Sequence, residues 1–229
     1  MKFGVVIFPG SNCDMDMIYV LEKILKQDVV QLWHKDTNLK GVDFIILPGG
    51  FSYGDYLRSG AIAKFSPIME QIIGFANAGG YVMGICNGFQ ILTESGLLPG
   101  ALLHNNSHKF ICKNIYLKTI AKDTLVTNKY GDDAIKIPIA HAEGRYFANQ
   151  ETLSLLEKNN QILFQYSDMN SEVTESANPN GSLMNIAEIC NTERNVFGMM
   201  PHPERAADKE INNQDGRLLF DSILNMATS

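Results

Sequence analysis

The first half of the chain alternates short apolar runs with segments of helical apolar spacing. Four apolar runs predict buried strands, at 2–8, 29–33, 44–47 and 81–85. Helical spacing predicts three helices among them, at 14–25, 67–77 and 87–94. Ser66 and Pro67 are a typical start for the second, with the serine hydroxyl as the cap. Strands that read as continuous apolar runs and alternate with helices are typical of a parallel sheet covered on both faces. We therefore predict an α/β fold with a mostly parallel central sheet.

After residue 100 the pattern changes to strict alternation of apolar and polar positions. Segments 110–117 and 134–140 predict half-exposed antiparallel strands that extend the main sheet. A short helix begins after Asn149, and strands at 161–166, 183–189 and 196–200 precede a last helix at 217–226. Because no repeat, low-complexity tract or linker interrupts the 229 residues, we expect one domain over 1–229.

Composition and charge exclude several classes of partner. The net charge is -6 and no run of Lys or Arg is present, which argues against nucleic acid. No apolar run reaches the length of a membrane span, and the N-terminus lacks a signal-peptide layout, so no membrane partner is expected. Four scattered cysteines favour a reducing compartment over a disulfide scaffold. These features predict a cytoplasmic globular protein.

A cysteine flanked by glycines stands between the predicted strand 81–85 and the predicted helix 87–94. Gly84 and Gly88 lie two residues before and after Cys86, which is the spacing of a nucleophile elbow with sulfur in place of oxygen. A sharp strand-to-helix turn strains the backbone, and side chains at the flanking positions would collide. The helix N-terminus favours thiolate over thiol. Cys86 is therefore a candidate nucleophile, although cysteine in an apolar stretch is also a common core residue.

Two H-x-E sequences offer a base with a carboxylate to orient it. His202 and Glu204 follow the predicted strand 196–200, and Pro203 between them favours an extended backbone at His202. In an extended segment the two side chains would point the same way, as a nucleophile's base and its orienting acid require. His141 and Glu143 have the same spacing after another strand. Spacing alone leaves both pairs open, and a surface turn would also explain either.

Two further groups of residues bear on the site. His104, His108 and Cys112 would line one face of a helix, as metal ligands could, but turn-forming residues at 99–100 and 105–106 disfavour that helix. No metal site is expected. For an oxyanion, the N–H of Asn87 is one natural donor, and the glycine turn at 48–50 is another source because it ends a strand. A plain tight turn would have the same residues.

Five segments together resemble class I glutamine amidotransferases, and more narrowly the glutaminase subunits of phosphoribosylformylglycinamidine synthase. The cysteine and H-P-E motifs are shared by the whole class, whereas the other segments point to this one group of subunits. The segments are LPGGFSYGDYLRSGAIA (47–63), GICNGFQIL (84–92), PIAHAEGRYF (138–147), NPNGS (178–182) and FGMMPHPER (197–205). The resemblance covers nearly the whole chain. A departure from the family pattern is Glu188, where many relatives have glycine.

The resemblance implies a flavodoxin-like three-layer sandwich and a role for each matched residue. It assigns Cys86 as the nucleophile, completed by His202 and Glu204, and so favours His202 over His141 as the base. The oxyanion donors match Gly50 and Asn87. Further roles are implied in two groups: glutamine contacts at Gln90, Gly49 and Ser107, and contacts with a synthetase at His141, Glu143 and Arg145.

The resemblance also implies an incomplete reaction in this chain. Glutamine hydrolysis yields ammonia, which a separate synthetase subunit would use to convert formylglycinamide ribonucleotide into formylglycinamidine ribonucleotide. That step needs ATP, yet the chain lacks both G-x-x-x-x-G-K-[ST] and G-x-G-x-x-G. No cofactor is expected here, and ATP with Mg is expected on the synthetase. A small accessory subunit is implied as a third member of the complex.

Two other functions are compatible with the same motifs. One is a stand-alone cysteine hydrolase, such as a γ-glutamyl hydrolase or a relative of cysteine peptidases, which would act without any partner. The other is a non-catalytic binding subunit that retains the fold. A stand-alone hydrolase would hydrolyse glutamine equally well with and without a synthetase. A non-catalytic subunit would leave Cys86 unmodified by a glutamine-like electrophile.

Overall fold

The computed structural model describes residues 1–226, and their contacts divide the chain into two units. Unit 1 comprises residues 1–98 and 195–199, and unit 2 comprises residues 99–194 and the described residues from 200 onward. The chain therefore passes between the units three times, after residues 98, 194 and 199. The single domain expected over 1–229 stays a prediction.

Unit 1 contains a sheet of five parallel strands in the order β2-β1-β3-β4-β11. The bounds are β1 Lys2–Ile7, β2 Asp28–Trp33, β3 Phe44–Leu47, β4 Tyr81–Ile85 and β11 Val196–Met199. All four residues of β3 and all four of β11 are buried, as continuous apolar runs predict. Each predicted strand of this unit agrees with the structure to within one residue at either end. The predicted parallel sheet is confirmed.

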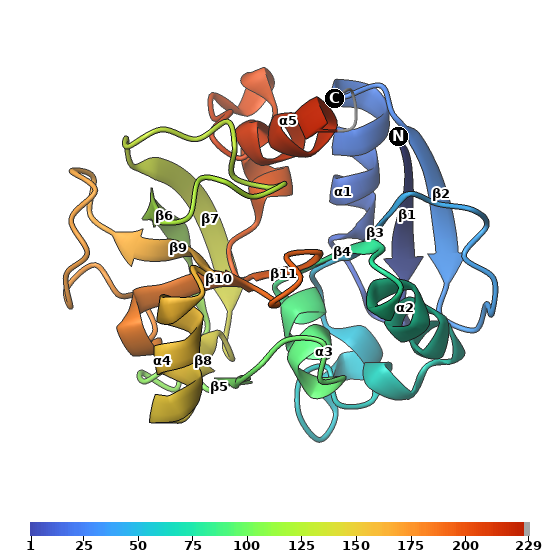
Figure 1. The fold of residues 1–229 in the computed structure, drawn as a ribbon, viewed down its shortest axis with the longest axis horizontal. Coiled ribbons are helices and arrows are strands. Elements are labelled where there is room, and N and C mark those ends of the chain that lie inside the picture. The colour runs from blue at the N-terminus through green and yellow to red at the C-terminus, as the bar shows by residue number, and fades with distance from the viewer. Residues whose placement is uncertain (227–229) are drawn as a thin grey trace. The chain divides into compact units, whose positions relative to one another are not determined.

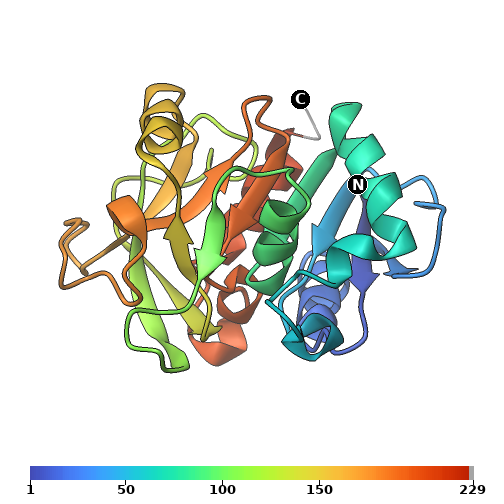
Figure 2. The same cartoon turned by 90° about the horizontal axis from the view of Figure 1, so that it is seen from below.

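Helices cover both faces of this sheet because its connections run in two directions. The connection from β1 leads outward to β2, whereas that from β3 leads the other way to β4. Right-handed crossovers then place their helices on opposite faces, and Figure 2 shows α1 in blue and α2 in teal on opposite sides of the strands. The helices are α1 Asp14–Tyr19, α2 Pro67–Asn77 and α3 Asn87–Glu94, with short turns η2 Ser52–Asp55 and η3 Ala63–Phe65.

The helix predicted over 14–25 begins where expected but changes its winding. From Val20 to Ile24 it continues as a π-helix (η1), and the N–H of Leu25 donates to the carbonyl of Val20, five residues earlier.

The predicted helix start at Ser66 and Pro67 is also present. Its serine hydroxyl makes no capping hydrogen bond and instead lies 2.8 Å from the hydroxyl of Tyr53 in η2.

Unit 2 consists mainly of antiparallel strands, as the alternating pattern predicts. Four of them pair in the order β10-β9-β6-β7, and two more form a separate pair, β5 with β8. The bounds are β5 Ala101–Leu103, β6 Ile111–Thr119, β7 Ile135–His141, β8 Arg145–Phe147, β9 Ile162–Ser167 and β10 Ile186–Cys190. The pair β5 and β8 was not predicted, because three residues are too few to show alternation.

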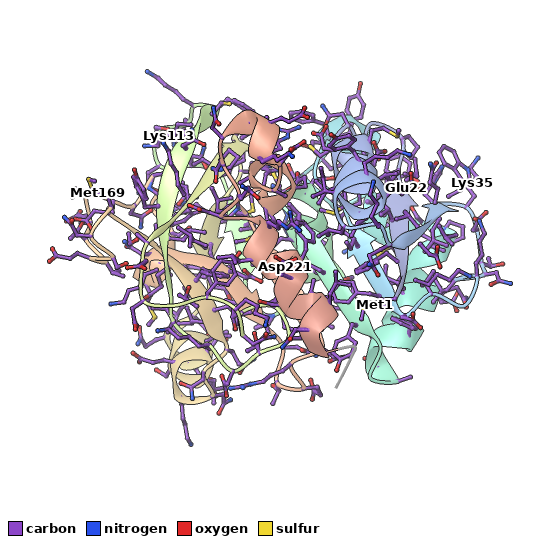
Figure 3. The ribbon with its side chains drawn as sticks, turned by 90° about the horizontal axis from the view of Figure 1, so that it is seen from above. Met1, Glu22, Lys35, Lys113, Met169 and Asp221 are labelled. Carbon is purple, nitrogen blue, oxygen red and sulfur yellow. The ribbon has the colours of Figure 1, made fainter. Side chains whose placement is uncertain are left out.

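Two helices and three short turns complete unit 2, and Figure 1 labels the strands and the longer helices. In unit 2 they are η4 Leu183–Asn185, η5 Pro203–Ala206, η6 Lys209–Ile211, α4 Gln150–Lys158 and α5 Arg217–Met226. Asn149 caps α4 as predicted, with its side chain accepting from the N–H of Thr152 at 2.8 Å. On α5 the half-buried Asp221, labelled in Figure 3, pairs with Arg217 at 3.5 Å. Among the residues described, no helix has the length and hydrophobicity that crossing a membrane requires.

Candidate active site

Cys86 occupies the sharp turn between β4 and α3. Its backbone has φ 50° and ψ -104°, a left-handed conformation that costs a non-glycine residue about 1–3 kcal/mol. The turn is held by the N–H of Cys86, which donates to the carbonyl of Met199 in β11 at 2.7 Å. The cysteine itself is 5% exposed. The strained elbow expected from the glycine spacing is therefore present, and such strain is typical of functional sites.

The flanking glycines are required because the backbone packs closely behind Cys86. A methyl group on Gly84 would lie 2.5 Å from the backbone of Gly88, and one on Gly88 would lie 2.0 Å from the carbonyl oxygen of Leu47. Real side chains do not approach backbone atoms so closely. The elbow thus fits only if both positions lack a side chain, which is the physical reason for the G-x-C-x-G pattern.

We expect Gly88→Ala to destabilise the fold by about 3 kcal/mol or more, since the new methyl group has to displace the backbone at Leu47. Urea unfolding measures this change. Gly74→Ala is the matched control, because Gly74 lies in the exposed interior of α2 and a methyl group there would meet nothing within 4 Å. That control should gain up to about 1 kcal/mol from helix propensity. Equal stabilities of the two variants would contradict the packing argument.

Asn87, the first residue of α3, ties the elbow to the turn η2. Its buried side chain accepts from the N–H of Ser52 at 3.1 Å and donates to the carboxylate of Asp55 at 3.2 Å. It also donates to the side-chain oxygen of Gln90 at 2.8 Å. Both Asn87 and Gln90 are buried in unit 1, next to the cysteine in sequence. The side chain of Asn87 is therefore fixed, and its main-chain N–H belongs to the first turn of a helix, where N–H groups lack intrahelical acceptors.

Gly49 and Gly50 form a turn after β3 that packs on the turn after β1. Gly50 has φ 137°, and a side chain there would lie 2.6 Å from the backbone nitrogen of Asn12. The carbonyl of Gly49 accepts from the N–H of Cys13 at 3.3 Å. The two turns follow neighbouring parallel strands, at the edge where open α/β sheets bind ligands. Only glycine fits this close approach, so the turn is more than a generic tight connection.

His202 and Glu204 form a buried pair in unit 2. The Nδ1 atom of His202 lies 2.6 Å from Oε1 of Glu204, and both side chains are 1% exposed. The N–H of His202 donates to the carbonyl of Pro138 in β7 at 2.9 Å. The predicted pairing is confirmed, but it arises from the 3₁₀ turn η5 that begins at Pro203 rather than from an extended segment. Because the carboxylate accepts from Nδ1–H, the lone pair of the imidazole is on Nε2.

The second H-x-E sequence has a different arrangement. His141 is buried at the end of β7, and its Nδ1 lies 3.1 Å from Oδ1 of Asn105. Glu143 instead lies 3.3 Å from Nε2 of His104. Burial, together with the nearby charge of His202, lowers the pKa of His141 to about 4. Of the two histidines, only His202 has a carboxylate at its Nδ1 among the described hydrogen bonds.

The remaining predicted residues of unit 2 lie on or near its surface. Ser107 is exposed, and its hydroxyl accepts from the N–H of Lys109 at 3.3 Å. Arg145, in β8, donates from Nε to the carbonyl of His104 at 2.9 Å. The helix that a metal site at 104–112 would need is not formed in this described segment, because Cys112 belongs to the strand β6. At 3% exposure, His141 could affect a synthetase contact only through its neighbours.

Known proteins similar to this chain identify its family. The CobB/CobQ-like glutamine amidotransferase domain family matches residues 1–219. The phosphoribosylformylglycinamidine synthase subunit PurQ of Moorella thermoacetica is 56% identical over 225 residues, covering 98% of this chain and 95% of the relative. The chain belongs to the PurQ family of glutamine amidotransferases. The PurQ subunit of Synechocystis sp. is also 56% identical, over 96% of this chain and 98% of its own length.

Solved structures agree with the family's fold. PurLQS from Thermotoga maritima contains a chain that is 43% identical, with a TM-score of 0.86 over 99% of this chain and 98% of that one. A putative GMP synthase subunit from Thermoplasma acidophilum is 12% identical with a TM-score of 0.63, which supports the fold alone. The α/β class with mostly parallel strands and an antiparallel extension is thereby confirmed, as is the resemblance drawn from the five sequence segments.

Two residues with evident roles in the site were not predicted. Asp55 holds the side chain of Asn87, and Asn105 holds the ring of His141. Asp55 lies in the family segment 47–63, so the sequence marks this segment as important. Nothing in the segment indicates that Asp55 contacts Asn87. Asn105 precedes His141 by 36 residues. No sequence pattern predicts that two residues so far apart will form a hydrogen bond. Side-chain partners across distant turns follow from the fold, not from local sequence pattern.

Proposed function

We propose that this chain is the glutaminase subunit of phosphoribosylformylglycinamidine synthase. It would hydrolyse L-glutamine and deliver the ammonia to an ATP-dependent synthetase subunit, which converts formylglycinamide ribonucleotide into formylglycinamidine ribonucleotide. The observation that carries this proposal is the strained cysteine elbow of Cys86 in a chain 56% identical to PurQ subunits of that synthase. The buried pair of His202 and Glu204 supplies a base of the kind that such a cysteine needs.

The nucleophile and base would act together on the side-chain amide of glutamine. Cys86 thiolate attacks the amide carbon, and Nε2 of His202 carries the proton that goes to the departing ammonia. A γ-glutamyl thioester remains on sulfur until water, deprotonated by His202, releases glutamate. Glu204 keeps the ring in the required tautomer and stabilises the imidazolium. His202 follows Met199 by three residues, and Met199 is the hydrogen-bond partner of the Cys86 N–H, which supports a joint role.

Stabilisation of the oxyanion is assigned to the main-chain N–H groups of Gly50 and Asn87. Gly50 lies in a turn that has no room for a side chain, and Asn87 begins the helix after the nucleophile. One preorganised donor of this kind is worth about 3 kcal/mol of transition-state stabilisation. We further assign glutamine contacts to Gln90, Gly49 and Ser107, of which Gln90 and Gly49 lie in the same unit as the elbow.

The synthetase and an accessory subunit complete the proposed reaction. PurLQS from Thermotoga maritima is a solved structure that contains a chain 43% identical to this one. We assign ATP and Mg to the synthetase, because activating an amide oxygen needs a phosphoryl donor and this chain has no phosphate-binding motif. Contacts with the synthetase are assigned to Glu143 and Arg145, with His141 acting behind them. We assign the complex to the cytoplasm; in the described structure none of the four cysteines forms a disulfide.

Glutamine hydrolysis by the purified chain, measured as glutamate release, tests this proposal. We expect weak activity alone and a large increase when the cognate synthetase, formylglycinamide ribonucleotide and ATP are added. Strong hydrolysis that no partner changes would instead indicate a stand-alone hydrolase. Labelling with diazo-oxonorleucine, a glutamine-like electrophile, tests the third function. An unmodified Cys86 in the assembled complex would indicate a non-catalytic binding subunit.

A further inference from the structure

The ring of His141 presents a buried nitrogen with no hydrogen-bond partner. His141 is 3% exposed, and its Nε2 atom has no partner among the residues that the structure describes. Buried polar atoms are nearly always paired, because an unpaired one loses its hydration without compensation. A buried nitrogen left open in this way suggests a ligand that completes its hydrogen bonding.

The hydrogen bonds of Asn105 define which ring nitrogen carries the proton. The amide nitrogen of Asn105 donates to the carbonyls of Lys109 and His141, both at 2.9 Å. Its oxygen is therefore the acceptor, and it receives the N–H of Gly144 at 3.2 Å as well as the ring of His141 at 3.1 Å. The ring donates from Nδ1–H, so Nε2 presents a lone pair. Any partner of Nε2 must be a hydrogen-bond donor.

The ring is also fixed in place from one side. A methyl group on Gly144 would lie 2.4 Å from the His141 ring, so the main chain of Gly144 packs directly against it. Asn105 forms hydrogen bonds with Nδ1 of the ring, with the carbonyl of His141 and with the N–H of Gly144. A side chain held by this many contacts keeps its free nitrogen in one direction, which is how binding groups are preorganised.

His141 cannot supply or store a proton at neutral pH. Burial is the largest cause of its pKa of about 4, and the nearby charge of His202 is the second. The two histidines are also linked through β7: the N–H of His202 donates to the carbonyl of Pro138 at 2.9 Å, and His141 ends the same strand three residues later. A neutral acceptor near the proposed base can bind a neutral donor without competing for the proton.

We propose that Nε2 of His141 is the hydrogen-bond acceptor for the ammonia that is released beside His202. The inference rests on the proposed function, which supplies ammonia as the product. Ammonia is small and neutral, and it has three N–H donors, so it matches a buried lone pair that lacks a donor. No covalent bond forms or breaks at His141. Because the ring has no proton on Nε2 to give, it retains ammonia as the nucleophile that the synthetase needs instead of converting it to ammonium.

The test compares ammonia use with ammonia production in the assembled complex of this chain, its synthetase and its accessory subunit. In the wild-type complex each glutamate formed should correspond to one formylglycinamidine ribonucleotide. In His141→Leu the ratio of glutamate to product should rise about fivefold. This is the factor in binding that the free energy of one ordinary hydrogen bond provides. His141→Gln, whose amide oxygen is again an acceptor, should restore part of the coupling. Synthesis driven by added ammonium chloride should be equal in all three complexes.

Ile139→Val is the matched control for packing. Ile139 is buried in β7, two residues before His141, and the change removes volume without removing an acceptor. It should lower the melting temperature while the ratio stays at one. If His141→Leu has the ratio of the wild type, or raises the KM for glutamine without changing the ratio, His141 is not the ammonia acceptor. If the wild-type complex itself makes no product from glutamine, the proposed function fails instead.

Discussion

Glutamine hydrolysis should fall by about 10⁴-fold or more in Cys86→Ala and in His202→Ala. Removing a nucleophile or its base eliminates the covalent pathway, and losses of this size are usual for groups that act as one unit. The variants are assayed as glutamate release in the presence of the synthetase, so that the activated rate is compared. Double replacement should cost little more than either single change, because the two residues serve the same step.

Two further variants make this prediction specific. Cys112→Ala replaces an exposed cysteine of β6 and should hydrolyse glutamine like the wild type. His141→Ala should retain much more hydrolysis than His202→Ala, because His141 has an amide and not a carboxylate at Nδ1. If His141→Ala were the more damaged of the two, the assignment of the base would be wrong.

Glu188→Leu should make the protein more stable, and more so at pH 8 than at pH 5. Glu188 lies in β10 with no exposed surface, and neither carboxylate oxygen has a hydrogen-bond partner in the described chain. Burial raises the pKa of this carboxyl from 4.5 to about 8. A leucine of similar volume removes the buried polar group without opening a cavity, a change that is often stabilising.

The direction of the pH effect follows from which state binds the proton more tightly. Between pH 4.5 and about 8 the folded chain keeps the proton on Glu188 and the unfolded chain loses it. The stability contributed by the protonated form is complete below pH 4.5 and is lost as the pH rises to about 8. At pH 7 the loss amounts to roughly 3 kcal/mol. Leucine cannot titrate, so the variant should lack this slope.

Urea unfolding at several pH values between 5 and 8 measures the effect. Glu188→Gln should flatten the pH dependence while keeping an unpaired polar group, which separates the titration from the packing. Glu157→Leu, at an exposed position of α4, is the control and should leave both the stability and its slope nearly unchanged. The same stability difference between Glu188→Leu and wild type at every pH would mean that Glu188 is not the titrating group.

The elements that sequence predicted best are those whose pattern is local. The strand at 81–85, the cysteine turn and the helix at 87–94 were expected to the residue, because a short apolar run and two glycines determine them together. The helix at 217–226 was equally well predicted. By contrast, the hydroxyl of Ser66 was expected at its own helix and was found on Tyr53, a partner that is close only after folding.

The site follows the same division. His202 and Glu204 were paired correctly from their spacing, although a 3₁₀ turn and not an extended strand brings them together. The two H-x-E motifs were indistinguishable by spacing, and their difference depends on Asn105 and His104, which approach from another part of unit 2. The family resemblance favours His202 in that choice, which local chemistry leaves open. The burial of Glu188 had no local signal, because a charged residue within a short strand can face either side.

The strand that holds Cys86 in place is synthesised long after the other strands of unit 1. β11 pairs with β4, and it joins unit 1 only after residues 99–194 have been synthesised. During that interval the edge of β4 lacks its final neighbour, and the carbonyl that will receive the Cys86 N–H does not yet exist. A nascent chain with such an exposed edge is prone to mispairing. Reactive sulfur geometry is thereby withheld until β11 has been synthesised, so products that terminate before this strand should be inert rather than wasteful of glutamine.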